Sequence, residues 1–529
     1  MDSGSLTLAW PLPPWSGGLL RGAGFCLIAA AAVASAGAQD LTLGRALQAA
    51  LVANPDVRSL GVRVEGAAAV LTQAQGIYDP LLTASAQRYD ENRPLTTAES
   101  LVSPSSENQY VRSSSFALGV EQKTTSGAAL IGLASGTYGQ DRVTQSLGLP
   151  SQSTGRLAFG VRLPLARGSG EQAVGAGIRA AERELEATNA QRRYVISLAL
   201  RDTAAAFWEY AARWRQLEIA QSGERRAAGL VDELRKLLAA DEIPAAEIDL
   251  SSASLVERVN ARIAAEQALS EARLALGRVM GVEPGRLSAI AAPANALPQT
   301  ASPGLERIRV SDLVDGAEKA RDDLQSLTLL IAAAREKTEQ ARDSARPLVD
   351  LTVSVGVSGL REGTSLSAYP NPLALSTAGP SVMMQLGAQY PYGNRVAQGQ
   401  IGQAMAALTD LEIRANALRT DIAAGVTTSA EGLQRAAQLL AVSRDLVGHY
   451  TKALEAERTK RRLGMSTLID VIAVEDRLQN TSLADIDRRR YYAVSIVRLK
   501  HELGTLLRPG GDRFDVREDD FLDYRPDAK

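Results

Sequence analysis

The sequence is poor in cysteine, histidine and aromatic residues. Among its 529 residues are one cysteine and two histidines, and aromatic residues make up 4%. A single cysteine cannot form an internal disulfide. The two histidines, His449 and His501, lack partners at metal-binding spacing, so no metal or other cofactor is predicted. Few aromatic residues and abundant alanine are more typical of packed helices than of one large globular core.

The chain also has little net charge and, beyond its first 38 residues, no long apolar run. Its 58 basic and 60 acidic residues give a net charge of -2, so no nucleic-acid partner is predicted. No later stretch approaches the roughly 18 consecutive apolar residues of a membrane helix. The sequence therefore predicts a protein outside the bilayer or one that meets a membrane with strands.

Residues 1–38 have the composition of a signal peptide. Arg21 precedes an apolar run from Gly22 to Ala34, and Ala36-Gly37-Ala38 forms a small-x-small cleavage site. The alternative interpretation is a short buried helix. Cys26 lies inside this run and follows Phe25 rather than a small residue, so a lipid anchor is not predicted. The exported chain would contain no cysteine.

Two segments of the chain share one helical pattern, 267 residues apart. Apolar or small residues recur at spacings of three and four, which marks one face of a helix. Each segment ends at a proline, Pro80 or Pro347, which lacks the amide hydrogen that a helix needs. This pattern predicts an internal duplication, with repeats over residues 39–282 and 313–507. The matched positions are Val57, Leu60, Val64, Ala67, Leu71 and Ala74, and Leu324, Leu327, Ile331, Ala334, Thr338 and Ala341.

After each proline the apolar period changes to two, which predicts strands over about 80–164 and 347–390. Four strands are expected in the first repeat and two in the second. The additional pair lies at about 116–138, around the turn Thr124–Gly127. Strands with one apolar and one polar face fit a sandwich core or a barrel in lipid, and alternation alone does not decide between them.

Each strand region is followed by a long stretch without proline, at 171–239 and 396–463. At about 1.5 Å per residue, each would form a helix of about 100 Å. In the second stretch an apolar residue recurs every seven positions, which is the pattern of a coiled coil. An ordinary amphipathic helix is the alternative, but it does not explain five successive heptad positions. These positions are Val426, Leu433, Leu440, Val447 and Leu454.

Both long helices are predicted to turn back at a short tip and to be followed by a returning helix. The predicted tips are 240–246 and 464–467, the returning helices 246–281 and 468–507, the linker between repeats 283–312, and the polar C-terminal tail 508–529. The acidic residues of the tail are expected to be solvated.

The second tip carries signals for the end of one helix and the start of the next. Gly464 ends the first helix, and Ser466 or Thr467 can cap the second through a side-chain oxygen. Asp470 and, in the first tip, Glu247 fall in the first turn of the returning helices. A carboxylate there interacts favourably with the helix dipole.

This order of elements, given twice after a signal peptide, resembles the TolC family of outer-membrane efflux channels. The resemblance extends from about Leu41 to Leu507 and is carried by "LTLGRALQAALVANPDV", the strand exits "VRLPLARG" and "AQYPYGNR", and the tip "GMSTLIDV". It implies an α+β membrane protein. Duplicated coiled-coil hairpins would form a periplasmic α-barrel, and antiparallel strands would join a trimeric outer-membrane β-barrel. One copy alone would leave sheet edges and helix seams uncovered, which is consistent with a homotrimer.

The resemblance also implies a gate at the periplasmic tips. Asp470 stands in the family's G-x-x-T-x-x-D pattern, and Glu247 matches the acidic position of the first tip. Where the family has an arginine to pair with that acid, this chain has Ser466, and Arg461 is the expected substitute. A ring of carboxylates would favour cations in a narrow mouth. The alternative is that Asp470 and Glu247 are only helix-start acids.

A second acidic ring is less well supported by the sequence. The family's acidic position three residues after Asp470 is Ala473 here, so a second ring would need Glu475 or Asp476.

The predicted function is an outer-membrane exit duct for efflux or secretion that extends into the periplasm and performs no chemistry. It would work with a periplasmic adaptor and an inner-membrane transporter of the RND or ABC type. Adaptor contacts are expected at Lys236, Lys460, Arg461 and Arg462. Two other classes remain open. A periplasmic coiled-coil adaptor usually has one hairpin, and a secreted structural coiled coil would have no use for the strands.

Overall fold

The computed structural model describes residues 40–102, 108–240, 245–305, 309–363, 380–507, 514 and 516–524. The predicted signal peptide, with Cys26, and residues 241–244 of the first predicted tip lie outside these ranges. Contacts divide the chain into two compact units. Unit 1 comprises Met1–Ala49, Thr203–Gln299 and Leu440–Ala493, and unit 2 comprises Ala50–Asp202, Thr300–Leu439 and Val494–Lys529.

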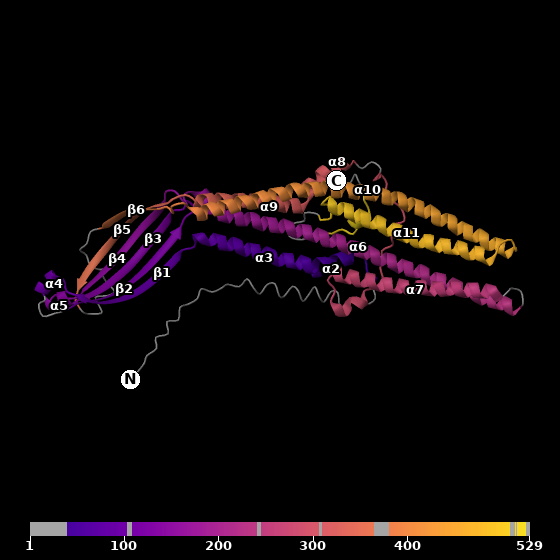
Figure 1. The fold of residues 1–529 in the computed structure, drawn as a ribbon, viewed down its shortest axis with the longest axis horizontal. Helices are drawn as coiled ribbons and strands as arrows, with labels where there is room; N and C mark the ends of the chain where they lie inside the picture. The colour runs from indigo at the N-terminus through magenta and orange to yellow at the C-terminus, as the bar shows by residue number, and fades with distance from the viewer. Residues whose placement is uncertain are drawn as a thin grey trace, which may run out of the picture. The chain divides into compact units, whose positions relative to one another are not determined.

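The helices occur in two similar sets (Figure 1). The first set is α2 (Leu43–Ala53), α3 (Pro55–Gln75), α6 (Glu171–Ala239) and α7 (Ala245–Val279). The second set is α8 (Val310–Ala320), α9 (Asp322–Ser344), α10 (Arg395–Arg462) and α11 (Leu468–Glu502). In each set, strands lie between the second helix and the third. No helix in the described part of the chain combines the length and apolarity that a membrane span requires.

Where the sequence predicts one short helix before each strand region, the structure has two. Asn54 caps α3 by accepting hydrogen bonds from the backbone N–H groups of Asp56 and Val57, and Pro55 suits the first helical position. The second break lies 267 residues later, at Arg321, whose extended backbone (φ -77°, ψ 119°) separates α8 from α9. The periodic apolar positions used for the prediction all lie within α3 and α9, which begin after these breaks. They therefore could not reveal the preceding helices α2 and α8.

The predicted apolar faces of these helices are their least exposed sides. Val57 and Leu60 of α3 are buried, and so are Leu324, Ala334 and Thr338 of α9. Four of the five heptad positions in α10 are also buried. They are Val426, Leu433, Leu440 and Leu454.

Six antiparallel strands of unit 2 form one sheet in the order β1-β2-β3-β4-β5-β6. Four precede α6 and two precede α10, the numbers expected from the sequence, and the additional pair is β2 and β3. Strands β1, β3 and β5 have their C-terminal ends on the same side of the sheet. We call this side the loop end. The strands are β1 (Leu81–Pro94), β2 (Asn108–Lys123), β3 (Ala129–Asp141), β4 (Gln152–Pro164), β5 (Leu348–Glu362) and β6 (Ser381–Gln389).

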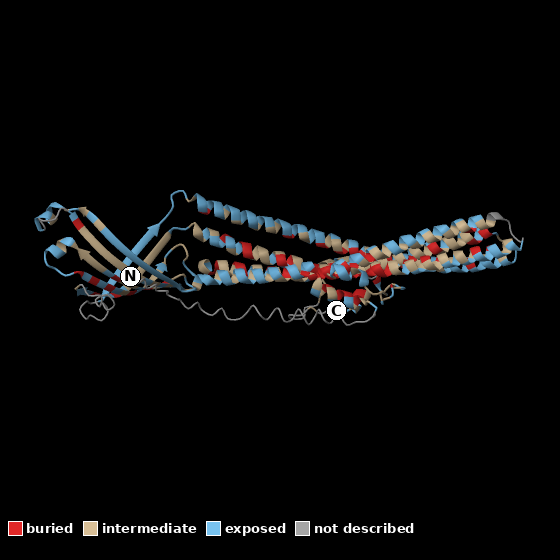
Figure 2. Ribbon diagram, turned by 90° about the horizontal axis from the view of Figure 1, so that it is seen from below, coloured by how far each residue is buried: buried red, intermediate tan, exposed pale blue. Residues whose placement is uncertain are grey.

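One face of this sheet is apolar and exposed. The side chains of Leu82, Phe159 and Val382 on this face are 77%, 63% and 68% exposed, and β1 and β6 are exposed along most of their length (Figure 2). The opposite face carries mainly small and polar residues. The register aligns one row of the apolar face across all six strands: Leu82, Val120, Gly132, Phe159, Val355 and Val382.

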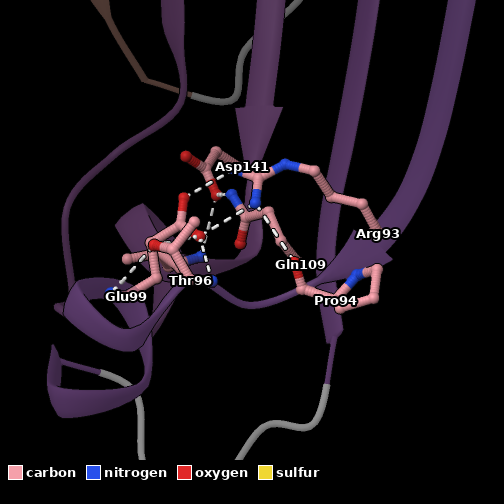
Figure 3. Close-up of polar contacts among 7 residues, drawn as sticks. Arg93, Pro94, Thr96, Glu99, Gln109 and Asp141 are labelled. Carbon is pink, nitrogen blue, oxygen red and sulfur yellow. Dashed lines mark hydrogen bonds and ion pairs between the residues drawn. The ribbon is translucent and has the colours of Figure 1, made fainter.

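Polar contacts hold the connections at the loop end (Figure 3). Arg93 of β1 contacts both carboxylate oxygens of Glu99, at 2.6 and 2.9 Å, and Thr96 donates to the same carboxylate through its N–H and hydroxyl groups. Glu99 lies on the short helix α4 (Thr97–Val102). Gln109 of β2 donates to Asp141 at the end of β3, directly before α5 (Arg142–Ser146).

A buried ion-pair cluster surrounds Arg321 in unit 2. Its guanidinium contacts Asp323 and Glu502, each at 2.6 Å, and the three side chains are 7%, 10% and 17% exposed. The same guanidinium lies 5.5 Å from the ring centroid of Tyr194. The residue that breaks the second helix is therefore also the centre of a desolvated charge network.

His501 is buried beside this cluster. Its side chain is 3% exposed, and Nδ1 is 3.0 Å from Oγ of Ser197. Burial lowers the pKa of His501 to about 3, and the positive charges of Arg201 and Arg321 act in the same direction. The imidazole is therefore neutral throughout the physiological pH range.

Unit 1 has an aromatic core on α6. Phe207, Trp208 and Tyr210 are 0%, 0% and 1% exposed. The Tyr210 hydroxyl donates to the carbonyl of Ala291 at 3.1 Å, which joins α6 to the segment that follows α7. The same segment pairs through Pro293 with Leu41, just before α2.

The described part of the predicted polar tail contains two buried aromatic residues, whereas its described acidic residues are exposed or half-buried. Phe521, in the short helix α12 (Asp519–Leu522), is 0% exposed and Tyr524 is 6% exposed. Lys500 of α11 donates to the carbonyl of Asp520 at 2.5 Å. Two aromatic residues three positions apart anchor this segment, and the acidic residues around them obscured that signal in the sequence.

Candidate functional site at the helical tips

Two helix-end motifs build the turn between α10 and α11. Gly464 has φ +70°, and the backbone N–H groups of Gly464 and Met465 donate to the carbonyls of Arg461 and Lys460, both at 2.9 Å. This is the pattern of hydrogen bonds that satisfies the last carbonyls of a helix. The chain reverses here because glycine adopts positive φ without the steric cost of a side chain.

Thr467 and Asp470 form a reciprocal cap at the start of α11. Oδ2 of Asp470 accepts hydrogen bonds from the N–H and hydroxyl groups of Thr467, at 3.0 and 2.5 Å. In return, Oγ1 of Thr467 accepts from the N–H of Asp470 at 3.2 Å. The arrangement is a capping box with aspartate in the place of glutamate. Of the two caps left open by the sequence, the structure selects Thr467.

Asp470 is exposed, and the hydrogen bonds from Thr467 lower its pKa. The carboxylate is therefore ionised at neutral pH, as a ring of negative charge would require. The same contacts are those of a helix-start acid, so the geometry accommodates both interpretations of Asp470.

Ser466 and the basic residues of this tip interact mainly within α10 and the turn. Oγ of Ser466 donates to one oxygen of Glu457 at 2.5 Å, and Nζ of Lys460 contacts the other at 3.0 Å. These contacts, with that from Ser466 the larger, lower the pKa of Glu457. Arg462 donates to Oγ1 of Thr459 at 3.3 Å. The position at which the resemblance implies an arginine thus contacts a different acid from Glu247.

The first tip presents Lys236 and Glu247 on either side of residues 241–244. Lys236 is exposed in the last turn of α6, and Glu247 is half-buried in the first turn of α7. Within the described part of unit 1, no hydrogen bond or ion pair joins Glu247 to Arg461 or Ser466. The substitution of Arg461 for the family's arginine stays a prediction.

Arginines from three helices hold the carboxylates of Glu475 and Asp476 on α11. Glu475 contacts Arg226 of α6 at 2.6 Å and Arg458 of α10 at 3.5 Å, and its side chain is 17% exposed. Asp476 forms an ion pair with Arg258 of α7. We call these five residues the α11 carboxylate cluster. Because each carboxylate has a guanidinium partner, neither Glu475 nor Asp476 offers an unpaired charge for a second acidic ring.

This cluster joins the α6–α7 hairpin to the α10–α11 hairpin inside unit 1. Arg262 of α7 also contacts Glu224 of α6 at 2.6 Å, which ties the two helices of the first hairpin together. Sequence reasoning missed Arg226 and Arg258. Both lie on helix surfaces rich in charge, and no spacing in the sequence links Arg226 to Glu475, 249 residues away.

Comparison with known proteins identifies the fold. No protein-family model and no curated protein matches the chain by sequence. Solved structures do match it, beginning with a membrane protein from Pseudomonas aeruginosa (TM-score 0.64, 16% identity, 87% of this chain and 92% of that chain). The outer membrane channel CmeC from Campylobacter jejuni gives a TM-score of 0.63 at 12% identity, over 88% of this chain and 85% of that one. The outer-membrane channel OprN gives 0.62 at 13% identity, over 88% and 90%. The chain has the fold of an outer-membrane channel.

This channel fold confirms the resemblance to the TolC family at the level of architecture. It covers both hairpins and the sheet, since each comparison spans at least 87% of the chain. The described residues contain two helical hairpins, α6 with α7 and α10 with α11. A periplasmic adaptor usually has one.

Proposed function

We propose that the chain is an outer-membrane exit duct for efflux or secretion that extends into the periplasm. The observation that carries this proposal is the exposed apolar face of the sheet, which continues from Leu82 on β1 to Val382 on β6. Soluble proteins rarely expose apolar patches of this extent. In lipid the same face would be buried in hydrocarbon, while the polar face would meet a water-filled lumen.

Three copies would complete one barrel. Strands β1 and β6 are the two edges of the sheet, and an unpaired edge in lipid would leave backbone N–H and C=O groups without partners. Pairing β6 of one copy with β1 of the next removes both edges. The helical hairpins of the three copies would then enclose a tunnel through the periplasm.

The tips would act as the gate of this duct. Asp470 and Glu247 would line the periplasmic mouth, and the α11 carboxylate cluster would hold the second hairpin against the first in the closed state. Opening would separate these ion pairs as the tip helices move apart. Adaptor binding would use Lys236, Lys460, Arg461 and Arg462, and an inner-membrane transporter of the RND or ABC type would supply the energy. The duct itself performs no chemistry.

Membrane fractionation combined with an export assay tests the proposal. We expect the protein to remain with the outer membrane after washing in high salt, and a deletion strain to accumulate dyes or drugs that the wild-type strain exports. Re-expression of the chain should restore export. A periplasmic adaptor or secreted coiled coil would be released by the salt wash, and that result would contradict the proposal.

A further inference from the structure

We infer that the sheet binds the phosphate group of a lipid headgroup at the loop-end border of its apolar face. The inference rests on the proposed function, because it requires this face to lie in a membrane. The feature that points to it is a pair of arginines on adjacent strands of the apolar face, Arg88 of β1 and Arg112 of β2. We call this pair the border arginines.

The register places Arg88 directly beyond the last apolar row and Arg112 one row further on. That row contains Ala86, Phe116 and Gly136, and a Cβ atom on Gly136 would lie 2.5 Å from the Phe116 ring, so the ring covers the glycine. Residues two apart in a strand share a face and are separated by about 7 Å. The next row on the same face, toward the loop end, is Arg88, Ser114, Tyr138, Ser153 and Arg361.

In that further row Asp90 pairs with Arg112 in the register, and the Asp90 carboxylate contacts both border arginines. Asp90 contacts Nε of Arg88 at 2.9 Å and Nε of Arg112 at 2.8 Å, and it accepts from the Tyr110 hydroxyl at 2.9 Å. The Arg112 side chain also donates through Nη2 to Tyr110 at 2.8 Å. Both contacts to Asp90 use Nε, so the terminal nitrogens of Arg88 take no part in them.

Charge and exposure favour an anion at this border. Two guanidinium groups and one carboxylate leave a net positive charge, and the side chains of Arg88 and Arg112 are 61% and 41% exposed. The planar fork of arginine matches the geometry of phosphate oxygens. At the opposite end of the same face no arginine occurs in the equivalent border positions, which are Gln122, Leu163, Leu351 and Leu386.

A lipid fits this border better than a free phosphate ion does, because it supplies two kinds of complementary group in one molecule. Its phosphate would meet the border arginines, while its acyl chains would cover Phe116, Leu118 and Phe159, which are 37%, 57% and 63% exposed. Each basic residue near a membrane surface strengthens the binding of anionic lipid by about fivefold. Tyr138 lies in the same row as Arg88, and the Tyr110 hydroxyl contacts Asp90 and Arg112, so both tyrosines lie at this border, where interfacial aromatic residues are favoured.

Native mass spectrometry of the full-length protein, purified in detergent from the outer-membrane fraction, tests this inference. The probes are lipid A, its fully dephosphorylated form and inorganic phosphate. We expect lipid A to remain bound and its dephosphorylated form to bind at least tenfold more weakly, with inorganic phosphate failing to displace lipid A. The double variant R88Q/R112Q should lose lipid A binding by about 25-fold, roughly fivefold for each arginine.

Matched variants separate phosphate binding from a structural role. R156Q/R162Q removes two arginines from the opposite face of the sheet and should bind lipid A as the wild type does. Asp90→Asn removes the carboxylate that neutralises part of the positive charge, so it should bind lipid A several-fold more tightly. If the cluster were only an internal ion-pair network, Asp90→Asn would lower stability without any gain in affinity.

The inference would be overturned by equal binding of R88Q/R112Q and the wild type, by equal loss in R156Q/R162Q, or by equal binding of lipid A and its dephosphorylated form. Displacement by inorganic phosphate would instead show an anion site without lipid selectivity, and would also overturn it. Absence of the protein from the outer-membrane fraction would contradict the proposed function itself, so the two failures are distinguishable.

Discussion

At the scale of single residues, Asp470 combines a local role with a proposed global one. Its carboxylate completes the capping box with Thr467, which fixes the first turn of α11. It is also exposed and ionised, which suits a charged ring at the mouth of a duct. The two roles can be separated because the cap depends on hydrogen bonds and the ring depends on charge.

We predict that Asp470→Asn weakens the block of single-channel current by multivalent cations about tenfold or more, because three negative charges leave a narrow mouth. Thr467→Ala is the matched control, since it breaks the cap but keeps the charge. Dose–response curves in planar bilayers give the measurement. Unchanged block in Asp470→Asn, or equal loss in both variants, would assign Asp470 to the cap alone.

His501 is the residue at which burial has the clearest consequence for pH dependence. In the folded chain its pKa is lowered to about 3, whereas an unfolded histidine has a pKa of about 6.5. Between about pH 3 and pH 6.5, His501 is therefore protonated in the unfolded state but not in the folded state. Stability is fully present above about pH 6.5 and is lost as the pH falls toward 3, by at most about 1.4 kcal/mol per pH unit for each chain.

We predict that His501→Gln flattens the decline in thermal stability between pH 7 and pH 5, because glutamine keeps a hydrogen-bonding group beside Ser197 but does not titrate. The other histidine, His449, is exposed on α10, and His449→Gln should retain the wild-type decline. Melting temperatures of the detergent-solubilised protein across this pH range give the measurement. The same pH dependence in His501→Gln and wild type would contradict the burial argument.

Among the secondary-structure elements, the sheet has two faces of opposite polarity. Val355 and Ser354 are neighbours on β5 with opposite orientations: Val355 pairs with Phe159 and Val382 on the apolar face, and Ser354 lies on the polar face. The Val355 side chain is 50% exposed. In a water-soluble sheet an arginine would be tolerated at Val355, whereas in a lipid-facing strand it would not.

We predict that Val355→Arg destabilises the membrane-inserted form by about 2–4 kcal/mol and sharply lowers the amount of folded protein in the outer membrane. Ser354→Arg should have little effect, because a charge on the polar face would stay hydrated. Heat-modifiable mobility on gels, measured for both variants after fractionation, provides the comparison. Equal amounts of folded protein from the two variants would contradict a lipid-facing sheet.

Much of this arrangement of elements could be predicted from the sequence because proline and glycine mark its boundaries. Pro80 and Pro347 precede the first strand of each half, and Gly464 lies two residues beyond the end of α10. The Thr467-x-x-Asp470 spacing likewise indicated where α11 begins. The break at Arg321 and the buried Phe521 could not be predicted, since both depend on partners distant in the sequence.

The same limit applies to the candidate site. The tip acids were visible in the sequence because each follows a helix-start signal, whereas the α11 carboxylate cluster depends on the packing of four helices. The sequence offers Glu475 and Asp476 as candidates for a second acidic ring. In the structure they form ion pairs with Arg226 and Arg258. Ion pairs between helices produce no periodic pattern in the sequence, so they could not be predicted from it.

At the level of the whole molecule, one chain alone leaves parts of its sheet without partners. Its sheet has two uncovered edges and an exposed apolar face, and both become satisfied only in a closed barrel within lipid. The fold shared with outer-membrane channels is consistent with that requirement.

Closure of the barrel by three copies is tested most directly by the mass of the detergent-solubilised protein, measured by native mass spectrometry. Its subunits have a mass of 56.0 kDa before any signal peptide is removed. We expect a species of three subunits that resists dissociation until heated, because every sheet edge is then paired. A stable, folded species of one subunit would contradict it.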